Sequence, residues 1–179
     1  MLFRNGTHLI DAICFFADAD PLTISGLLDD EHRNYPPFYS GDGGRDPASD
    51  PGGSALITFT NGVRAFVNAS KGTPETFELD VFGETGRIRV GNTLAEICRY
   101  NEHVAATTQL PRIYTIRSHI FAAINELIQL VEHGGTPTSS GADGRRVLSI
   151  LLGFLQSNAG NGIPITFPVV DIAVTRPME

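Results

Sequence analysis

Apolar residues recur every three or four positions in three stretches of the chain, a spacing typical of amphipathic helices. The first stretch covers residues 6–16, and the second covers residues 116–133 and is followed by two glycines. The third runs over residues 140–160, starts with the Ser-x-x-Asp spacing of a capping box, and is apolar on most sides. We therefore predict three helices, and we expect the third to be central in the fold.

The middle of the chain instead alternates apolar and polar residues, as strands with one buried face do. Residues 55–60 and 63–69 flank Asn61-Gly62, a dipeptide that favours a type I′ hairpin because both turn residues must adopt positive φ. The alternation continues over residues 75–82, 87–90 and 94–100. These segments predict an antiparallel meander with one face packed on a core.

Two further strands are expected outside the meander, over residues 22–28 and 163–167. Pro164 confines the second of these to a sheet edge or a closing position, because proline has no N–H to donate. Residues 29–54 hold four prolines, five glycines and six acids, and they predict a long, solvated surface loop. The tail over residues 168–179 is expected to be exposed.

Helices at both ends and strands gathered in the middle, without βαβ alternation, predict an α+β fold. We expect one domain over residues 1–179, with a mainly antiparallel open β-sheet and helices packed on one face. A chain of 179 residues of which 41% are hydrophobic is long enough to close a core without disulfides or metals.

Charge and cysteine content narrow the classes of function. The net charge is −7, and Lys71 and the twelve arginines are scattered, so the sequence predicts no nucleic-acid partner. Cys14 and Cys98 form no CxxC motif, and His103, His119 and His133 lack metal-ligand spacing, so no metal site is expected. Without an apolar run long enough to span a bilayer or a signal segment, a cytoplasmic location without membrane contact is expected.

Four strings occur in an order that points to a known family. They are Gly6-Thr-His-Leu-Ile-Asp11, Gly53-Ser-Ala-Leu-Ile-Thr-Phe-Thr-Asn-Gly62, Gly83-Glu-Thr-Gly-Arg-Ile-Arg-Val90, and Asp143-Gly144 with Ser157 and Gly162. Together they resemble the carboxyl-terminal domain of the Gfo/Idh/MocA oxidoreductases, the glucose-fructose oxidoreductase and inositol dehydrogenase family. The resemblance extends from about Gly6 to Pro168.

The resemblance implies a domain that binds substrate and forms oligomers. In that family a separate amino-terminal Rossmann domain binds NAD or NADP, and a sugar or polyol binds where the two domains meet. The open sheet often packs against a neighbouring subunit, so a homodimer or larger assembly is expected. The first helix of the domain supplies the family histidine, which is His8 here.

Residues at the start of the first helix are the candidate site. His8 and Asp11 lie three positions apart, so on a helix they share a face, and they are the candidate catalytic pair for proton exchange with a substrate hydroxyl. Arg4, Asn5 and Thr7 are the candidate substrate-binding residues, and the fork of Arg4 suits a phosphate or carboxylate. The alternative is structural: His8 and Asp11 pack or cap, Arg4 lies on the surface, and Asn5 or Thr7 caps the helix.

Two departures from the family limit what this chain should do alone. No GxGxxG motif follows a strand, since Gly41-Asp-Gly-Gly44 lies in an acidic loop. Where the family commonly has an acidic residue, four positions before its histidine, this chain has Arg4. Separately, Ser157 has no nearby histidine or acid in the sequence that would make it a nucleophile. We therefore expect the chain to bind no NAD and to transfer no hydride by itself.

Two other hypotheses remain open. The chain could be a free-standing oligomeric binding or assembly module that has lost the chemistry. It could also be an unrelated small α+β enzyme that acts through His8 and Asp11 without any dinucleotide.

Overall fold

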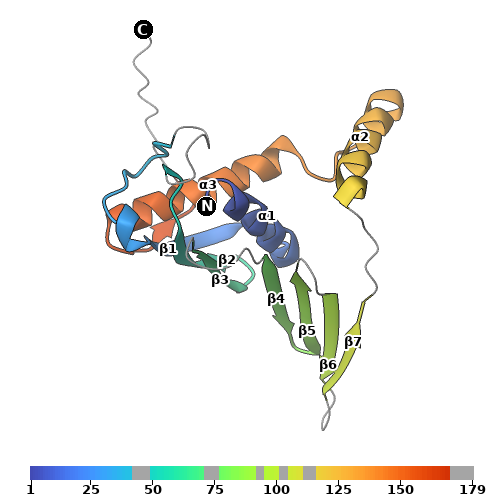
Figure 1. Cartoon of the computed structure of the whole chain (residues 1–179), viewed down its shortest axis with the longest axis horizontal. Coiled ribbons are helices and arrows are strands. Elements are labelled where there is room, and N and C mark those ends of the chain that lie inside the picture. The colour runs from blue at the N-terminus through green and yellow to red at the C-terminus, as the bar shows by residue number, and fades with distance from the viewer. Residues whose placement is uncertain (42–48, 71–76, 92–94, 101–104, 111–115, 170–179) are drawn as a thin grey trace. The chain divides into compact units, whose positions relative to one another are not determined.

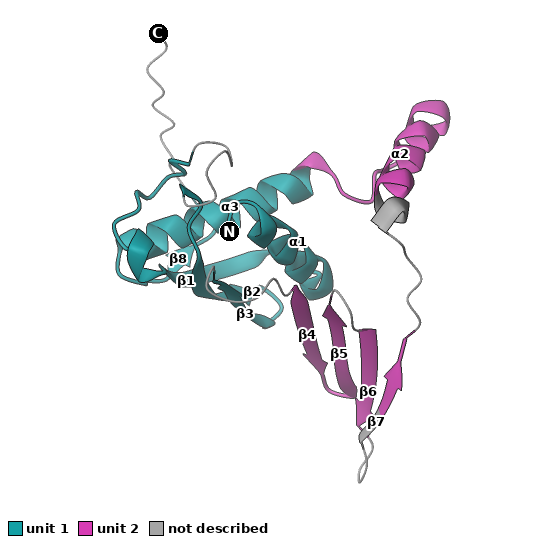
Figure 2. Cartoon of the chain, in the orientation of Figure 1, with its two compact units in different colours: residues 1–73, 142–179 teal, residues 74–141 magenta. Residues whose placement is uncertain are grey.

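The computed structural model describes residues 1–41, 49–70, 77–91, 95–100, 105–110 and 116–169. The chain divides into two compact units: unit 1 comprises residues 1–73 and 142–179, and unit 2 comprises residues 74–141 (Figure 2). Each unit contains a four-stranded antiparallel sheet, which confirms the predicted α+β class. That residues 1–179 form one domain stays a prediction.

Unit 1 is a sheet backed by two helices. The strand order is β3-β2-β1-β8, and the helices are α1 and α3 (Figure 2; Figure 1 gives the position of each element along the chain). Their bounds are α1 Asn5–Ala17, β1 Pro21–Leu28, β2 Gly53–Phe59, β3 Arg64–Ala69, α3 Gly141–Ala159 and β8 Ile165–Thr166. The short strand β8 pairs with β1 at the edge of the described sheet, which is one of the two positions predicted. It covers two residues of the predicted range 163–167, and Pro164 lies just before it.

The core of unit 1 lies between the sheet and α3. Alternate residues of β1 and β2, such as Ile24 and Ile57, are fully buried together with Ile150 and Phe154 of α3. Phe154 lies so close to β1 that a Cβ on Gly26 would come within 2.5 Å of its ring. Glycine at position 26 is therefore what allows the helix to approach the strand, and the third helix is central as expected.

Two polar side chains of α3 complete this packing. The backbone N–H of Gly26 donates to Ser157 Oγ at 2.9 Å, and the N–H of Leu28 donates to Asn158 Oδ1 at 3.0 Å. Ser157 Oγ in turn donates to the carbonyl of Ile163 at 2.6 Å. Ser157 is fully buried, and its hydroxyl joins β1 to the segment that follows α3.

Unit 2 holds the meander and the long helix. The sheet order is β4-β5-β6-β7, with β4 Glu78–Gly83, β5 Gly86–Gly91, β6 Ala95–Tyr100 and β7 Ala105–Gln109. Helix α2 covers Ile116–His133, the range that the apolar spacing predicts. The alternation did not predict β7, whose stretch Ala-Ala-Thr-Thr-Gln carries little apolar contrast between its faces.

One face of the unit 2 sheet carries an ion-pair ladder. Arg87 donates from Nε and Nη2 to the two carboxylate oxygens of Asp80, each at 2.9 Å, and Arg89 Nε lies 3.2 Å from Asp80 Oδ1. The Arg87 guanidinium also lies 5.3 Å from the ring centroid of Phe82. This face is therefore the polar face of the sheet.

The hairpin between β2 and β3 forms, but the predicted turn type is wrong. Positive φ occurs at Gly62 (87°) and not at Asn61, whereas type I′ needs both. Four residues separate β2 from β3, and the Asn61 side chain is used otherwise. Its Oδ1 accepts the N–H of Val63 and its Nδ2 donates to the carbonyl of Ala17 at 2.9 Å.

The loop over residues 29–54 also differs from the prediction. It contains a 3-10 turn over Asp30–His32 and ends in β2, which begins at Gly53. Asp50, expected to be solvated, is fully buried. Burial is tolerated because the carboxylate pairs with the ammonium group of Met1 and its Oδ1 accepts the backbone N–H of Phe3 at 2.9 Å. Asp42 and Asp46 lie outside the described residues.

Candidate functional site

Helix α1 presents one buried and one exposed face. Gly6, Ile10 and Ile13 lie on the buried face. His8 and Asp11 lie on the exposed face, so the structure places the predicted catalytic pair one helical turn apart in contact with solvent. Among the described residues, no hydrogen bond or ion pair joins the two side chains.

The predicted substrate-binding residues lie one turn earlier. Arg4 occupies the N-cap position without a side-chain cap, and its side chain is exposed. Neither Asn5 nor Thr7 caps the helix, which corrects that alternative: Thr7 Oγ1 donates to the carbonyl of Arg4 at 2.6 Å, and Asn5 Nδ2 contacts Met1 Sδ at 3.9 Å. The helix begins at Asn5, so both residues lie inside its first turn and neither stands at the N-cap position.

The segment around Asp50 anchors this end of α1. The N–H of Leu2 donates to the carbonyl of Pro51 at 2.8 Å, beside the bond from Phe3 to Asp50. Leu2 is fully buried, and Phe3 packs on Tyr39 with ring centroids 4.4 Å apart. These contacts hold the first turn in place under its exposed polar residues. Sequence reasoning missed this role of Asp50, although its position just before a buried strand was visible.

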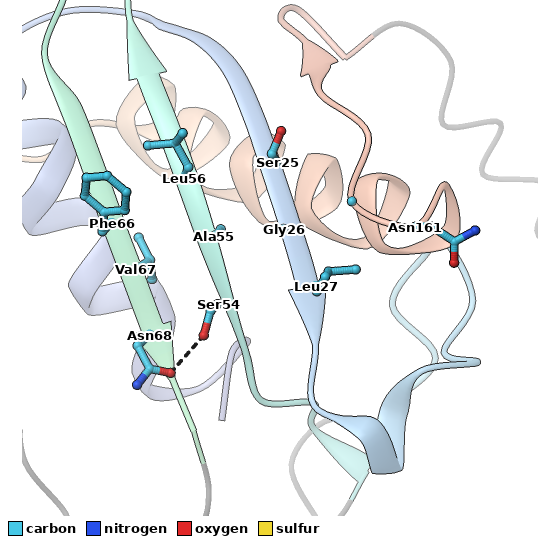
Figure 3. A pocket seen from close by; sticks show the side chains of 11 residues that line it. Ser25, Gly26, Leu27, Ser54, Ala55, Leu56, Phe66, Val67, Asn68 and Asn161 are labelled. Carbon is cyan, nitrogen blue, oxygen red and sulfur yellow. Dashed lines mark hydrogen bonds between the residues drawn. The ribbon is translucent and has the colours of Figure 1, made fainter.

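The outer face of the unit 1 sheet is the second surface of interest. It forms a shallow cavity of about 600 Å³ that faces away from the helices (Figure 3). Phe66 is 81% exposed and Leu27 is 54% exposed, and a hydrogen bond of 3.1 Å joins Ser54 Oγ to Asn68 Oδ1 beside them. A broad apolar face with a few polar groups is suited to contact with another protein surface.

A third feature is a cleft of about 630 Å³ between the end of α1 and the start of α3. The cation that lines this cleft, Arg146, is already paired. Its Nε lies 3.4 Å from Asp20 Oδ1, and its Nη1 lies 3.3 Å from Asp143 Oδ1. Burial raises the pKa of the Cys14 thiol to about 11, so this cysteine stays protonated and unreactive near neutral pH. The cleft therefore shows no ready catalytic group.

The described residues do not fit a dinucleotide. All described strand pairs are antiparallel, and no described strand leads through a glycine-rich turn into a helix, as a pyrophosphate site requires. Gly41 is described, but residues 42–48 of the glycine-rich loop lie outside the described part. Within that part, no group of three or more His, Cys, Asp or Glu side chains could hold a metal ion. None of the described helices combines the length and the apolar character needed to cross a membrane.

Comparison with known proteins supports one family. Residues 1–89 match the family model described as the GFO/IDH/MocA C-terminal domain. The comparison with curated proteins found no match.

Solved structures share the fold at low identity. A protein from Desulfitobacterium hafniense classed as an NADPH-dependent oxidoreductase is 14% identical with a TM-score of 0.73, covering 92% of this chain and 47% of its own. The WlbA dehydrogenase from Bordetella pertussis, in complex with NADH and UDP-GlcNAcA, is 15% identical with a TM-score of 0.61, covering 93% and 44%. The 3-ketoreductase KijD10 from Actinomadura kijaniata is 21% identical with a TM-score of 0.61, covering 84% and 45%. The chain thus spans about half the length of these proteins.

Proposed function

Because the chain belongs to the GFO/IDH/MocA C-terminal domain family, we propose that it is the substrate-binding and dimerising half of an NAD(P)-dependent oxidoreductase. The substrate would be a sugar, a polyol or a related hydroxy compound. The observation that carries the proposal is the exposed face at the start of α1, where Arg4, His8 and Asp11 lie within two turns of one anchored helix.

The chemistry of this face is proton exchange. A carbinol carbon releases hydride only if its oxygen gives up a proton, and a histidine can take and return that proton near neutral pH. His8 and Asp11, which share the exposed face of α1, are the proposed catalytic pair, with His8 as the group that exchanges the proton. Arg4, Asn5 and Thr7 would bind polar groups of the substrate, with Arg4 suited to a phosphate. The complex of WlbA with UDP-GlcNAcA supports a phosphate-containing sugar as one substrate class.

The antiparallel pairing of the described strands supports a division of labour between two domains. NAD or NADP would be bound by a separate Rossmann domain rather than by the antiparallel sheets described here. The outer face of the unit 1 sheet, with Leu27 and Phe66 exposed, is the proposed homodimer surface, because apolar patches of this kind are unusual on a monomer. We also propose a cytoplasmic location.

The substrate face can be tested on the chain itself. We expect millimolar UDP-N-acetylglucosamine to shift the NMR signals of His8 and its neighbours, and the Arg4→Ala variant to weaken this response. Arg64→Ala, which removes an exposed arginine from β3, is the matched control and should leave it unchanged. Equal responses in all three proteins, or none in the parent chain, would contradict the assignment of this face.

The nucleotide assignment has its own test. Calorimetric titration with NADH should show no saturable binding to residues 1–179. Micromolar affinity would overturn the proposed division of labour.

A free-standing assembly module is the second candidate. Arg4 in place of the acid common in the family favours it, together with the exposed apolar sheet face. Reading the gene upstream of Met1 separates the two: an in-frame strand-GxGxxG-helix segment supports the oxidoreductase, and a stop codon with a ribosome-binding site supports the module. For either candidate, analytical ultracentrifugation should show a dimer or larger species, and a clean 19.3 kDa species at high concentration would contradict dimerisation.

A further inference from the structure

Four exposed side chains form one line along α1. Arg4, His8, Asp11 and Phe15 recur every three or four residues, so they lie on the same side of the helix. Phe15 is 75% exposed, and the ring of Phe16 packs on it edge to face with ring centroids 5.4 Å apart. The proposed function gives a role to the first three residues of this exposed line and none to the aromatic ring at its end.

Phe15 also lines the cleft between the end of α1 and the start of α3. All described residues of this cleft of about 630 Å³ belong to unit 1. Three carboxylates and one guanidinium line it beside the ring, and the guanidinium is paired with two of the carboxylates: Asp18, Asp20, Asp143 and Arg146. Phe15 thus joins the exposed line of α1 to a hollow of the size that small-molecule sites have.

The two ends of the exposed line differ in charge. Arg4 stands at the amino-terminal end of α1, where the helix dipole adds positive potential. At the carboxyl-terminal end the dipole is negative, and carboxylates are in excess in the cleft. An anionic group of a ligand is therefore favoured beside Arg4 and disfavoured in the cleft. Neutral hydroxyl groups can donate to the carboxylates of the cleft, and an apolar ring face can pack on Phe15.

Phe15 has no place in the core of unit 1. The buried side of α1 carries Gly6, Ile10 and Ile13, whereas the ring of Phe15 lies on the exposed side. Exposure alone would mean little, because single apolar side chains are common on protein surfaces. The position of Phe15, on the line of His8 and at the wall of a cleft, distinguishes it from such side chains.

We infer that Phe15 is a substrate-binding residue that selects sugars with a second, uncharged ring. His8 and Phe15 are seven residues apart, so about 10 Å of helix separates them, which is more than one sugar ring spans. A single ring at His8 leaves Phe15 uncovered, whereas a ring linked to it lies in the cleft with its C–H face on Phe15. This inference rests on the proposed function and names the substrate class more closely, as a glycoside of two rings whose anionic group lies at Arg4.

Two phosphorylated sugars test this inference on the chain itself. Trehalose 6-phosphate has two rings, and glucose 6-phosphate carries the same phosphate on a single ring. In NMR titrations, the affinity for trehalose 6-phosphate should exceed that for glucose 6-phosphate by roughly threefold to tenfold, the effect of one aromatic contact. The signals of His8 should respond to both sugars, and those of Phe15 should respond to trehalose 6-phosphate alone.

Variants of the ring make the test specific. Phe15→Ala should lower the affinity for trehalose 6-phosphate to that for glucose 6-phosphate, and Phe15→Tyr should keep the preference for two rings. Phe38→Ala removes a ring that is 54% exposed outside the line, and this control should also keep the preference. Equal affinities in the parent chain, or a preference that survives in Phe15→Ala, would overturn this inference alone. No response of His8 to either sugar would overturn the proposed function as well.

Discussion

Two antiparallel sheets of four strands have very different interiors in this protein. In unit 1 the inward side chains of β1 and β2 are fully buried under α3, whereas in unit 2 no described side chain is fully buried. Strand number and antiparallel pairing are the same in the two sheets. The comparison teaches that a buried interior in such a sheet comes from the helix layer packed against it and not from the backbone ladder itself.

The largest contrast is expected from removing one aromatic ring in each unit. Phe154→Ala should lower the free energy of unfolding by about 3–5 kcal/mol, because the ring fills the space between α3 and the sheet at Gly26. Phe82→Ala, at a ring that is 70% exposed in unit 2, should cost less than about 1 kcal/mol. Urea unfolding followed by circular dichroism measures both. Equal losses would refute the contrast between the units.

A smaller effect is expected from the buried hydroxyl of α3. Ser157→Ala leaves the N–H of Gly26 without its acceptor, so the free energy of unfolding should fall by about 1–3 kcal/mol. Ser149→Ala on the exposed side of the same helix is the control, because its hydroxyl only donates to the carbonyl of Arg145. That variant should stay within about 0.5 kcal/mol of the parent. A change at Ser157 no larger than the control would contradict the anchoring role.

A third comparison uses the pH dependence of stability and the two cysteines, Cys14 in unit 1 and Cys98 in unit 2. Burial raises the pKa of Cys14 from 9.0 to about 11, so between these values the unfolded thiol ionises while the folded one stays neutral. The unfolded state then binds fewer protons, and this contribution to stability is complete below pH 9 and is lost as the pH rises to about 11. The free energy of unfolding of the parent protein should therefore fall between pH 9 and about 11. The part of this fall that is due to Cys14 should be absent in Cys14→Ala and present in Cys98→Ala. The reverse result would place the buried thiol in unit 2.

The smallest effect is expected on the polar face of the unit 2 sheet. The hydrogen bonds to Asp80 raise the pKa of Arg87 further above its ordinary value. Because the pair is solvated, Asp80→Asn should lower the melting temperature less than Ser157→Ala does, and high salt should reduce the difference from the parent. Thermal melts at two salt concentrations measure this. A large loss that salt does not change would show that the ladder carries buried structure.

The periodicity of the sequence predicted most helices and strands well, but it predicted the burial and the hydrogen-bond partners of single residues less well. The range of α2, the central position of α3, the β2–β3 hairpin and the edge strand after Pro164 all follow from local spacing and turn chemistry. The burial of Asp50 does not, since its acceptor role depends on Phe3, which lies 47 residues away. The turn type at Asn61 was wrong for a similar reason, because its side chain bonds to Ala17.

For the candidate site, too, the sequence predicted some features and the structure added others. Helical spacing alone predicts that His8 and Asp11 share a face, and the structure adds that this face is exposed. The catalytic and binding roles of these residues, and of Arg4, Asn5 and Thr7, stay predictions that the titrations above address.

The order of residues determined by itself the three helices and most of the strands, β7 excepted, and which of their faces are apolar, because these properties depend on neighbours a few positions apart. The tertiary structure alone decided which apolar faces are covered. It also decided that the Phe154 ring lies against Gly26, and that Ser157 accepts a backbone hydrogen bond from Gly26, 131 residues away. Such contacts depend on where distant segments meet, and short-range periodicity carries no information about that.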